Sequence, residues 1–336
     1  MKVDGGIPSV GIEEIGRVAK ELEEVGYDGG ITAEMAHDPF LPLVVAAEHT
    51  EQLDLGTGIA VAFARNPMTL ANIGYDLQTF AKGRFRLGLG SQIKAHIEKR
   101  FSMPWSHPAP RMRELILATR AIWDSWNDGT PLDFRGEFYR HTLMTPFFVP
   151  GPNPYGNAKI SLAAVGARMT EVAAEVADGI ILHAFTTERY VREVTLPALE
   201  RGFAKGDKQR SDFEISGPLF IVSGANDQEF EKAREGTKQQ IAFYGSTPAY
   251  RGVLELHGWG DLQDDLNRLS KQGEWVAMGA LITDEILDAF AVVAVPEDIP
   301  KAMLARYGGL VDRLSFYAPY RSNPERWRQV LAGFKQ

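Results

Sequence analysis

Acidic and imidazole side chains follow a short apolar segment that we expect to be a strand. Glu34 comes directly after residues 27–33, and His37 and Asp38 follow in the same loop. A carboxylate and an imidazole at the end of a strand can donate or accept a proton, or orient a bound group. Asp38 precedes Pro39 and could simply cap the next helix, and Glu34 could serve the loop in the same way. Glu34 and His37 are our candidate catalytic residues.

Glycines interrupt an apolar run further along the chain. Residues 53–62 are typical of a strand, yet they include Gly56 and Gly58. Strands rarely tolerate such glycines unless another backbone or a ligand approaches closely. Two interpretations stay open: a bulge that helps to close a barrel, or a flat cofactor that lies against the backbone.

Small residues mark an expected strand-to-helix turn at residues 163–170. Gly166 and Ala167 would let main-chain N–H groups approach an anion, and a helix start carries partial positive charge. Arg168 could add a bidentate contact to a phosphate. Many ordinary turns are also built from small residues, so a connection without a ligand is the alternative.

Several common site motifs are missing. The run that starts at Gly88 and Gly90 suggests a dinucleotide fingerprint, but its third glycine position is Ile93. The sequence has no P-loop, no Gly-x-Ser-x-Gly elbow and no His-Glu-x-x-His motif. Its seven histidines show no metal-ligand spacing, so we expect no catalytic metal. The lack of cysteine excludes disulfides, thiolate ligands and cysteine nucleophiles.

The charge balance restricts the possible partners. The 336 residues include 44 acidic and 36 basic side chains, a net charge of −8. That balance argues against a nucleic-acid grip and against attraction to anionic membranes. Residues 1–7 lack the apolar core of a signal peptide, and no apolar run approaches the roughly 20 residues of a membrane helix. We therefore expect a cytoplasmic protein with a small-molecule substrate and neither a nucleic-acid nor a membrane partner.

Short apolar strands alternate with helical patterns through most of the chain, which predicts a parallel sheet. The expected strands are 2–7, 27–33, 55–63, 84–90, 159–164, 179–183, 213–222 and 311–317. Helices are expected at 12–25, 40–51, 68–81, 111–126, 168–177, 188–205 and 296–307. Eight such strands favour a closed (β/α)8 TIM barrel over an open sheet. We expect one domain over 1–336, with a mostly helical insertion at 227–290.

Together these segments resemble the bacterial-luciferase-like superfamily, and more narrowly its coenzyme F420-dependent oxidoreductases. The most specific part is residues 82–90, Lys-Gly-Arg-Phe-Arg-Leu-Gly-Leu-Gly, supported by Leu-Gly-Thr-Gly-Ile at 55–59. Softer similarities extend over nearly the whole chain, at 26–28, 65–67, 70–71, 113–114, 136–139 and 177–179. The region 243–259 resembles an actinobacterial-type subgroup assigned to coenzyme F420.

This resemblance implies a luciferase-like TIM barrel that holds an isoalloxazine-type ring at the carboxyl ends of its strands. It implies a non-proline cis peptide behind the ring, here Gly58–Ile59. The phosphate-bearing tail would lie on the turn formed by Val165, Gly166, Ala167 and Arg168. The position often held by an asparagine is His96 here, and Ala60 and Ser91 complete the expected cofactor-binding residues. A homodimer is implied as well.

The sequence departs from one branch of the family. The deazaflavin sugar-phosphate dehydrogenases carry an Asp-His pair where this chain has Glu34 and Met35, and an acidic residue where it has Ile93. Neither their sugar substrate nor their histidine-based proton abstraction is therefore implied. Further pocket or tail candidates are Trp105, Lys94, Lys99, Arg100 and Arg111.

We expect hydride transfer between coenzyme F420 and a small organic substrate, with a separate cofactor-reducing dehydrogenase as a possible partner. One alternative is an FMNH2-dependent monooxygenase that uses O2 and a separate flavin reductase, with FMN as its cofactor. Another is a catalytically silent flavin-binding protein.

Overall fold

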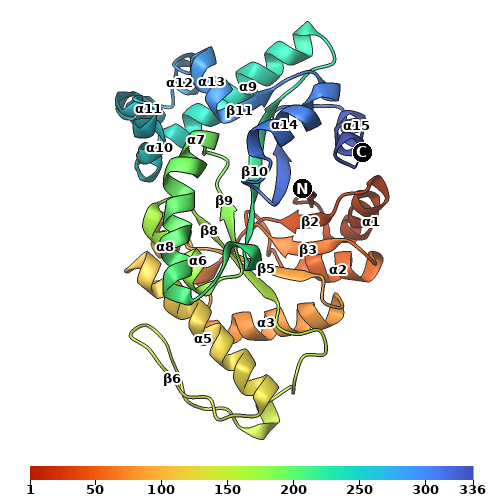
Figure 1. The fold of residues 1–336 in the computed structure, drawn as a ribbon, viewed down its shortest axis with the longest axis vertical. Coiled ribbons are helices and arrows are strands. Elements are labelled where there is room, and N and C mark those ends of the chain that lie inside the picture. Colours follow the sequence, from red (N-terminus) through yellow and green to blue (C-terminus); the bar gives the residue numbers. More distant parts are fainter. Residues whose placement is uncertain (336) are drawn as a thin grey trace.

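The fold is a closed barrel of eight parallel strands, seen in a computed structural model that describes residues 1–335 (Figure 1). Each barrel strand pairs with the next one in the chain, and the last pairs with the first. This arrangement confirms the predicted TIM barrel. The barrel strands are β1 (Lys2–Gly6), β2 (Gly29–Thr32), β3 (Asp54–Thr57), β5 (Phe85–Gly90), β8 (Lys159–Ala164), β9 (Gly179–Leu182), β10 (Glu214–Val222) and β12 (Arg313–Tyr317).

Helices connect the strands and cover the outside of the barrel. Local sequence explains where they begin and end. The Asn66 side chain caps α3 in a reciprocal box with Thr69, and Gly26 ends α1 in the left-handed conformation that glycine adopts easily. The outer helices are α1 (Ile15–Val25), α2 (Leu41–His49), α3 (Pro67–Phe80), α5 (Pro108–Asp128), α6 (Ala167–Val176), α8 (Leu196–Gly206) and α14 (Ile299–Tyr307).

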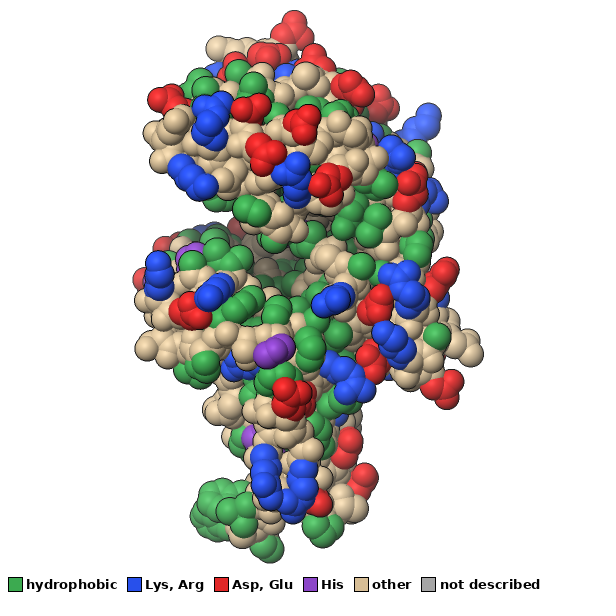
Figure 2. Space-filling view, turned by 90° about the vertical axis from the view of Figure 1, so that its left-hand side faces the viewer, with side chains coloured by type: hydrophobic (Ala, Val, Ile, Leu, Met, Phe, Trp, Pro, Cys, Tyr) green, Lys and Arg blue, Asp and Glu red, His purple; other side chains and the backbone are tan. Residues whose placement is uncertain are grey.

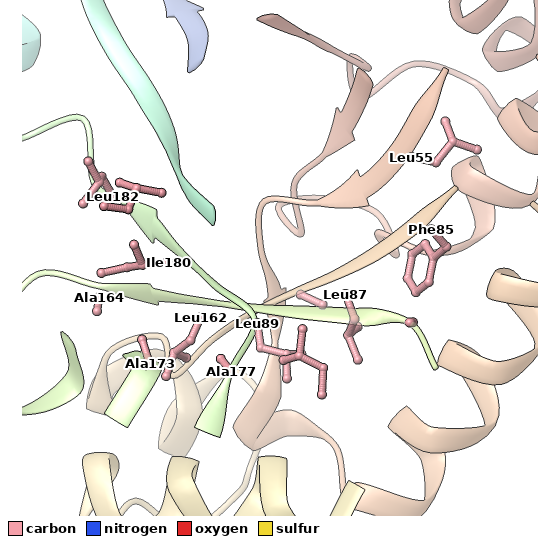
Figure 3. Packing of buried hydrophobic residues seen from close by; sticks show 14 of the residues in the cluster. Leu55, Phe85, Leu87, Leu89, Leu162, Ala164, Ala173, Ala177, Ile180 and Leu182 are labelled. Atoms are coloured by element: carbon pink, nitrogen blue, oxygen red, sulfur yellow. The ribbon is translucent and has the colours of Figure 1, made fainter. Parts of the chain in front are cut away.

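The main core fills the space between the strands and these helices. Figure 3 shows Leu87, Leu89 and Leu162 on neighbouring strands, with Ala173 of α6 and Ala177 beside them. All five side chains are fully buried. Small residues on the helix let it approach the sheet, while leucines on the strands fill the volume between them.

Residues 227–290 lie at one end of the molecule (Figure 1) and form a second apolar cluster with residues after β9 and on β10, among them Phe185 and Phe220. The segment leaves β10 and returns to it, because β11 (Ala291–Val293) pairs with the last residues of β10. It therefore lies beyond the carboxyl end of a barrel strand. Its helices are α9 (Asp227–Gly245), α10 (Arg251–Leu256), α11 (Gly260–Gln272), α12 (Trp275–Ala280) and α13 (Asp284–Phe290).

Ion pairs fill the opposite end of the barrel interior. Arg313 contacts Asp4, Asp54 and Glu214, and Arg86 bridges Asp4 and Glu214 at 3.0 and 2.7 Å. The Arg313 side chain is only 2% exposed. We call these five residues the base cluster, since they plug the amino-terminal end of the barrel.

Some elements differ from the sequence prediction. The expected third strand is broken in two, β3 and β4 (Ala60–Val61), with Gly58 and Ile59 between them. The sequence pattern also gave no sign of four short or terminal elements. They are α4 (Lys94–Lys99), the hairpin of β6 (Phe134–Arg135) and β7 (Arg140–His141), β11, and α15 (Pro324–Phe334). No helix within the described residues is both long and apolar enough to cross a bilayer.

Candidate active site

The carboxyl ends of the barrel strands open into a hollow beside the helical insertion. Figure 2 shows this hollow between the insertion and the rest of the molecule, with largely hydrophobic walls. TIM-barrel enzymes place their chemistry at this end of the strands. The residues that face this hollow are therefore the candidate site residues.

Strand alternation identifies which residues face the barrel mouth. Side chains point alternately to the two faces of a strand, and Asp4, Arg86 and Arg313 meet inside the barrel. Every second residue after them therefore faces the interior as well. On β1 and β5 these residues are glycines: Gly6, Gly88 and Gly90. On β12 the series ends at Tyr317, and the matching residue after β9 is His183.

The mouth is thus divided into two unlike halves. Gly6, Ala33, Gly58 and Gly90 line the half formed by β1 to β5 and carry nothing larger than a methyl group, while Ile31, which pairs with Gly6, is a larger side chain beside Gly58. A Cβ atom at Gly6 would meet no atom within 4 Å. The half formed by β9 and β12 carries large polar rings. The first half has room for a flat molecule, and the second can make directed hydrogen bonds to one.

The backbone between β3 and β4 is tightly held. The Gly58–Ile59 peptide bond is cis, at the position that the resemblance implied. Glu34 accepts hydrogen bonds from the Val61 N–H at 2.7 Å and from Arg65 Nη1 at 2.6 Å. Its side chain is 7% exposed. The Glu34 carboxylate is therefore committed to the protein, and its visible task is to fix the bulge.

Close backbone contacts explain the glycines of β5. A Cβ atom at Gly88 would lie 1.7 Å from the carbonyl oxygen of Thr57, and one at Gly90 would lie 2.9 Å from the Ile59 side chain. The Thr57 hydroxyl donates to the Gly88 carbonyl and accepts from the Gly88 N–H, at 2.6 and 3.0 Å. The Gly-Leu-Gly run therefore serves the packing of β5 against the bulge.

The start of α6 is open and uncapped. Gly166 is the N-cap residue, with φ −80° and ψ 152°, and has no side chain to bond the first N–H groups. A Cβ atom at Gly166 would meet nothing within 4 Å. Arg168 is exposed, and no acidic residue of the described chain pairs with it. Free N–H groups, helix polarity and a nearby cation make an anion site chemically reasonable here.

The other expected site residues are spread around the mouth. Ala60 is fully buried, and Ile59, Ser91, Val165 and Ala167 are half-buried. His37 lies exposed in the loop after β2, and His96 lies exposed on α4. Lys94 and Lys99 also lie exposed on α4, and Arg100 follows it and donates to the Met35 carbonyl. That contact joins α4 to the loop of Glu34 and His37.

Two further candidates have a structural explanation. Arg111 is buried and donates to the Pro104 carbonyl at 2.7 Å and to the Tyr139 hydroxyl at 3.0 Å. The expectation that it could meet an anionic tail is therefore wrong, because its guanidinium is enclosed and already bonded. Trp105 packs edge-on against Phe63 at 5.7 Å between ring centroids.

The polar rings of the mouth were not predicted from the sequence. His183 follows β9 and lies 4.6 Å, centroid to centroid, from both Tyr244 and Tyr250. The Tyr244 and Tyr317 hydroxyls are 2.8 Å apart. Burial lowers the pKa of His183 to about 4. The sequence offered one signal for His183, which is the last residue of the predicted strand 179–183 and so lies at a strand end, as Glu34 does. Nothing in the sequence connects His183 with the distant tyrosines.

The sequence matches one known protein family over most of its length. Residues 2–313 match the family described as luciferase-like monooxygenases. The chain belongs to that family. An uncharacterized protein of Mycobacterium tuberculosis is 58% identical over 314 residues, which cover 94% of this chain and 92% of that protein. A 5,10-methylenetetrahydromethanopterin reductase of Archaeoglobus fulgidus is 26% identical over 87% of this chain and 86% of its own length.

Solved structures share the fold at low identity. The coenzyme F420-dependent tetrahydromethanopterin reductase from Methanopyrus kandleri superposes with a TM-score of 0.79, at 18% identity over 99% of this chain and 96% of that one. A type II Baeyer-Villiger monooxygenase of Pseudomonas putida, solved with FMN, superposes at 0.67, with 15% identity over 98% of this chain and 95% of that one. The fold is therefore common to deazaflavin and flavin enzymes.

Proposed function

We propose that the protein is an oxidoreductase that transfers a hydride between coenzyme F420 and a small organic substrate. The observation that carries this proposal is one barrel mouth that combines a glycine-lined half with the uncapped helix start at Gly166. Only β5 separates β3 from β8, the strand that leads to Gly166, so these two strands are two strand spacings, about 10 Å, apart. An elongated molecule with a flat ring and an anionic tail matches that spacing.

The residues fit such a cofactor. The small residues of β1 to β5 leave room for the ring beside Ile31, and the backbone around Gly58–Ile59 would support one face of the ring. The N–H groups at the start of α6 would bond the phosphate, with Arg168 beside them. Lys99 adds an exposed positive charge on α4 for a longer anionic tail.

The reduced deazaflavin supplies a hydride and its oxidised form accepts one. The protein's contribution is position and environment. Glu34 and Arg65 hold the bulge in place, the insertion shields the mouth from bulk water, and the polar rings of the other half hold the substrate. Fixing two reacting carbon atoms at contact distance accounts for much of an enzyme's rate enhancement. The choice of F420 is supported by the named cofactor of the structurally similar Methanopyrus kandleri reductase.

A reduced-flavin monooxygenase is the second candidate. It is favoured by the description of the family and by the FMN-containing neighbour of the same fold. The two candidates use the same mouth and differ in the ring system and in the need for O2.

Titration of the purified protein with F420 and with FMN, followed by cofactor fluorescence, separates them. We expect F420 to bind and FMN to bind at least tenfold more weakly. Bound reduced F420 should then be oxidised under anaerobic conditions by a suitable carbonyl acceptor. Tight binding of FMN together with no binding of F420 would reject the proposal in favour of the monooxygenase.

A further inference from the structure

Four rings from distant parts of the chain meet at the β9 and β12 side of the mouth. They are His183 after β9, Tyr244 near the end of α9, Tyr250 before α10, and Tyr317 at the end of β12. His183 packs between Tyr244 and Tyr250, and Tyr244 bonds Tyr317. We call these four residues the ring cluster. It joins the barrel directly to the insertion.

His183 offers one free hydrogen-bond donor. Its Nδ1 accepts the Phe185 N–H at 3.0 Å, and burial keeps the ring neutral because it lowers the pKa to about 4. A neutral ring whose Nδ1 accepts carries its proton on Nε2. Within the described residues nothing accepts a hydrogen bond from that nitrogen, so Nε2–H is available to a ligand.

The tyrosine pair offers a second donor. Two hydroxyl groups that share one hydrogen bond use only one of their two protons, so the other can be donated to a ligand. Burial raises the pKa of both Tyr244 and Tyr317. Both hydroxyls therefore stay protonated near neutral pH.

The ring cluster contains no formal charge. Its members are one imidazole and three phenol rings, and burial lowers the pKa of the imidazole. The rings contact one another, and the Tyr244 hydroxyl contacts the Tyr317 hydroxyl. A carboxylate or phosphate placed here would lose water without gaining a counter-ion, which is unfavourable. The cations of the mouth, by contrast, lie on the α4 and α6 side.

We propose that the ring cluster is the substrate subsite and that it takes a neutral ketone or alcohol with a flat apolar body. The substrate oxygen accepts hydrogen bonds from His183 Nε2–H and from the Tyr244–Tyr317 pair, and the apolar body stacks on the rings. The inference rests on the proposed function for its role in turnover. As a binding site it stands on the geometry of the cluster alone.

Binding of simple probes to the protein without cofactor tests the subsite. Acetophenone has the carbonyl and the flat body, benzoate replaces the ketone with a charge, and ethylbenzene lacks the oxygen. We expect acetophenone to bind, measured by ligand-observed NMR, and the other two to bind at least fivefold more weakly. Absence of acetophenone binding, or benzoate binding of equal strength, would overturn the proposal.

Variants of the ring cluster test where acetophenone binds. Tyr244→Phe and His183→Phe should each weaken acetophenone binding about five- to tenfold, the effect of one neutral hydrogen bond. Tyr155→Phe is the matched control, because Tyr155 lies outside the mouth on the loop before β8 and is 47% exposed. Circular dichroism confirms that each variant is folded. Acetophenone affinities that equal the wild-type value in both mouth variants would place the subsite elsewhere.

F420 titration of the same variants separates this inference from the proposed function. We expect unchanged F420 affinity in Tyr244→Phe, because the tyrosine lies on the other half of the mouth. Wild-type protein that binds acetophenone but not F420 would reject the cofactor and leave the subsite standing. Protein that binds F420 but shows no selectivity among the probes would reject the subsite and leave the cofactor proposal standing.

Discussion

The three histidines around the mouth have very different surroundings. His37 and His96 are exposed to water, whereas His183 is enclosed by Tyr244 and Tyr250. An enclosed imidazole resists protonation because its charged form loses hydration. His183 is therefore suited to donate a hydrogen bond and not to act as a cation at neutral pH.

Burial of His183 makes the folded protein sensitive to acid. The unfolded chain protonates this imidazole below its ordinary pKa of 6.5, whereas the native state does so only near pH 4. The unfolded state therefore binds more protons in this window, and the native state loses about 3 kcal/mol as the pH falls through it. Urea unfolding at pH 7 and pH 5 measures the effect. Between these values wild type should lose about 2 kcal/mol more than His183→Gln, and equal losses would contradict the assignment.

Gly166 gives a residue-level test of the anion site in which stability and binding change in opposite directions. Aspartate is a favoured N-cap residue, and the backbone angles at Gly166 suit it. Gly166→Asp should therefore raise the stability of the protein by a few tenths of a kcal/mol. The same carboxylate would repel a phosphate at the helix start, so F420 affinity should fall at least tenfold.

Gly166→Ala is the control for that variant, since its methyl group meets no atom. Thermal unfolding and fluorescence titration supply the two measurements. Unchanged F420 affinity in Gly166→Asp would mean that the cofactor tail lies elsewhere.

At the scale of elements, the broken third strand depends on a residue outside it. Glu34 belongs to the loop after β2, yet it bonds the Val61 backbone of β4 and the Arg65 side chain. Arg65 also donates to the Val61 carbonyl at 3.0 Å. The bulge is therefore held by a carboxylate that sequence reasoning had considered for proton transfer.

Removal of this carboxylate should loosen the bulge. We expect Glu34→Ala to lower the free energy of unfolding by about 3 kcal/mol, because it leaves the Val61 N–H without its acceptor and takes from the mostly buried Arg65 one of its two carboxylate partners, Asp38 being the other. Glu34→Gln, which keeps one acceptor oxygen, should cost less. The exposed Glu48→Ala on α2 is the control and should be neutral. Urea unfolding measures all three, and a stable Glu34→Ala variant would show that the bulge holds without this contact.

The regular elements could be predicted from the sequence, and so could the strand ends and the helix start on which the candidate cofactor residues lie. Apolar periodicity places the eight barrel strands within a few residues, since one face of each strand and helix must be buried. The turn at Gly166 was found because small residues mark a strand-to-helix junction locally. The ring cluster could not be found, because Tyr244 and Tyr317 meet only after the insertion folds back on the barrel. Short elements such as α4 lack a periodic pattern long enough to detect.

At the scale of the whole molecule, the barrel is polar at its closed end. Arg313 is almost fully enclosed by Asp4, Asp54 and Glu214. Charges in such a place tolerate burial only when each has its partner. The base cluster also draws on β1, β3, β5, β10 and β12, so it ties strands from both halves of the chain together.

Loss of the central cation should destabilise the entire barrel. Arg313→Met retains much of the side-chain volume but leaves three carboxylates without their shared partner, and we expect a loss of about 3–5 kcal/mol. Arg321→Met removes an exposed arginine near the carboxyl end and should be nearly neutral. The midpoint of chemical denaturation distinguishes the two. Arg313→Met protein as stable as Arg321→Met would show that Arg86 alone balances the acids.

The pairing of β10 with β11 affects which parts of such a protein can change in evolution without loss of the barrel. The helical segment departs after Val222 and returns at Ala291, next to the strand that it left. The two ends of the segment are therefore neighbours in the sheet. A longer, shorter or entirely different segment could connect them without a change to the closed eight-stranded barrel. Tyr244 and Tyr250 arrive with that segment, whereas the glycines and the helix start at Gly166 belong to the barrel. Exchange of this one segment would therefore replace Tyr244 and Tyr250 and leave the proposed cofactor residues of the barrel unchanged.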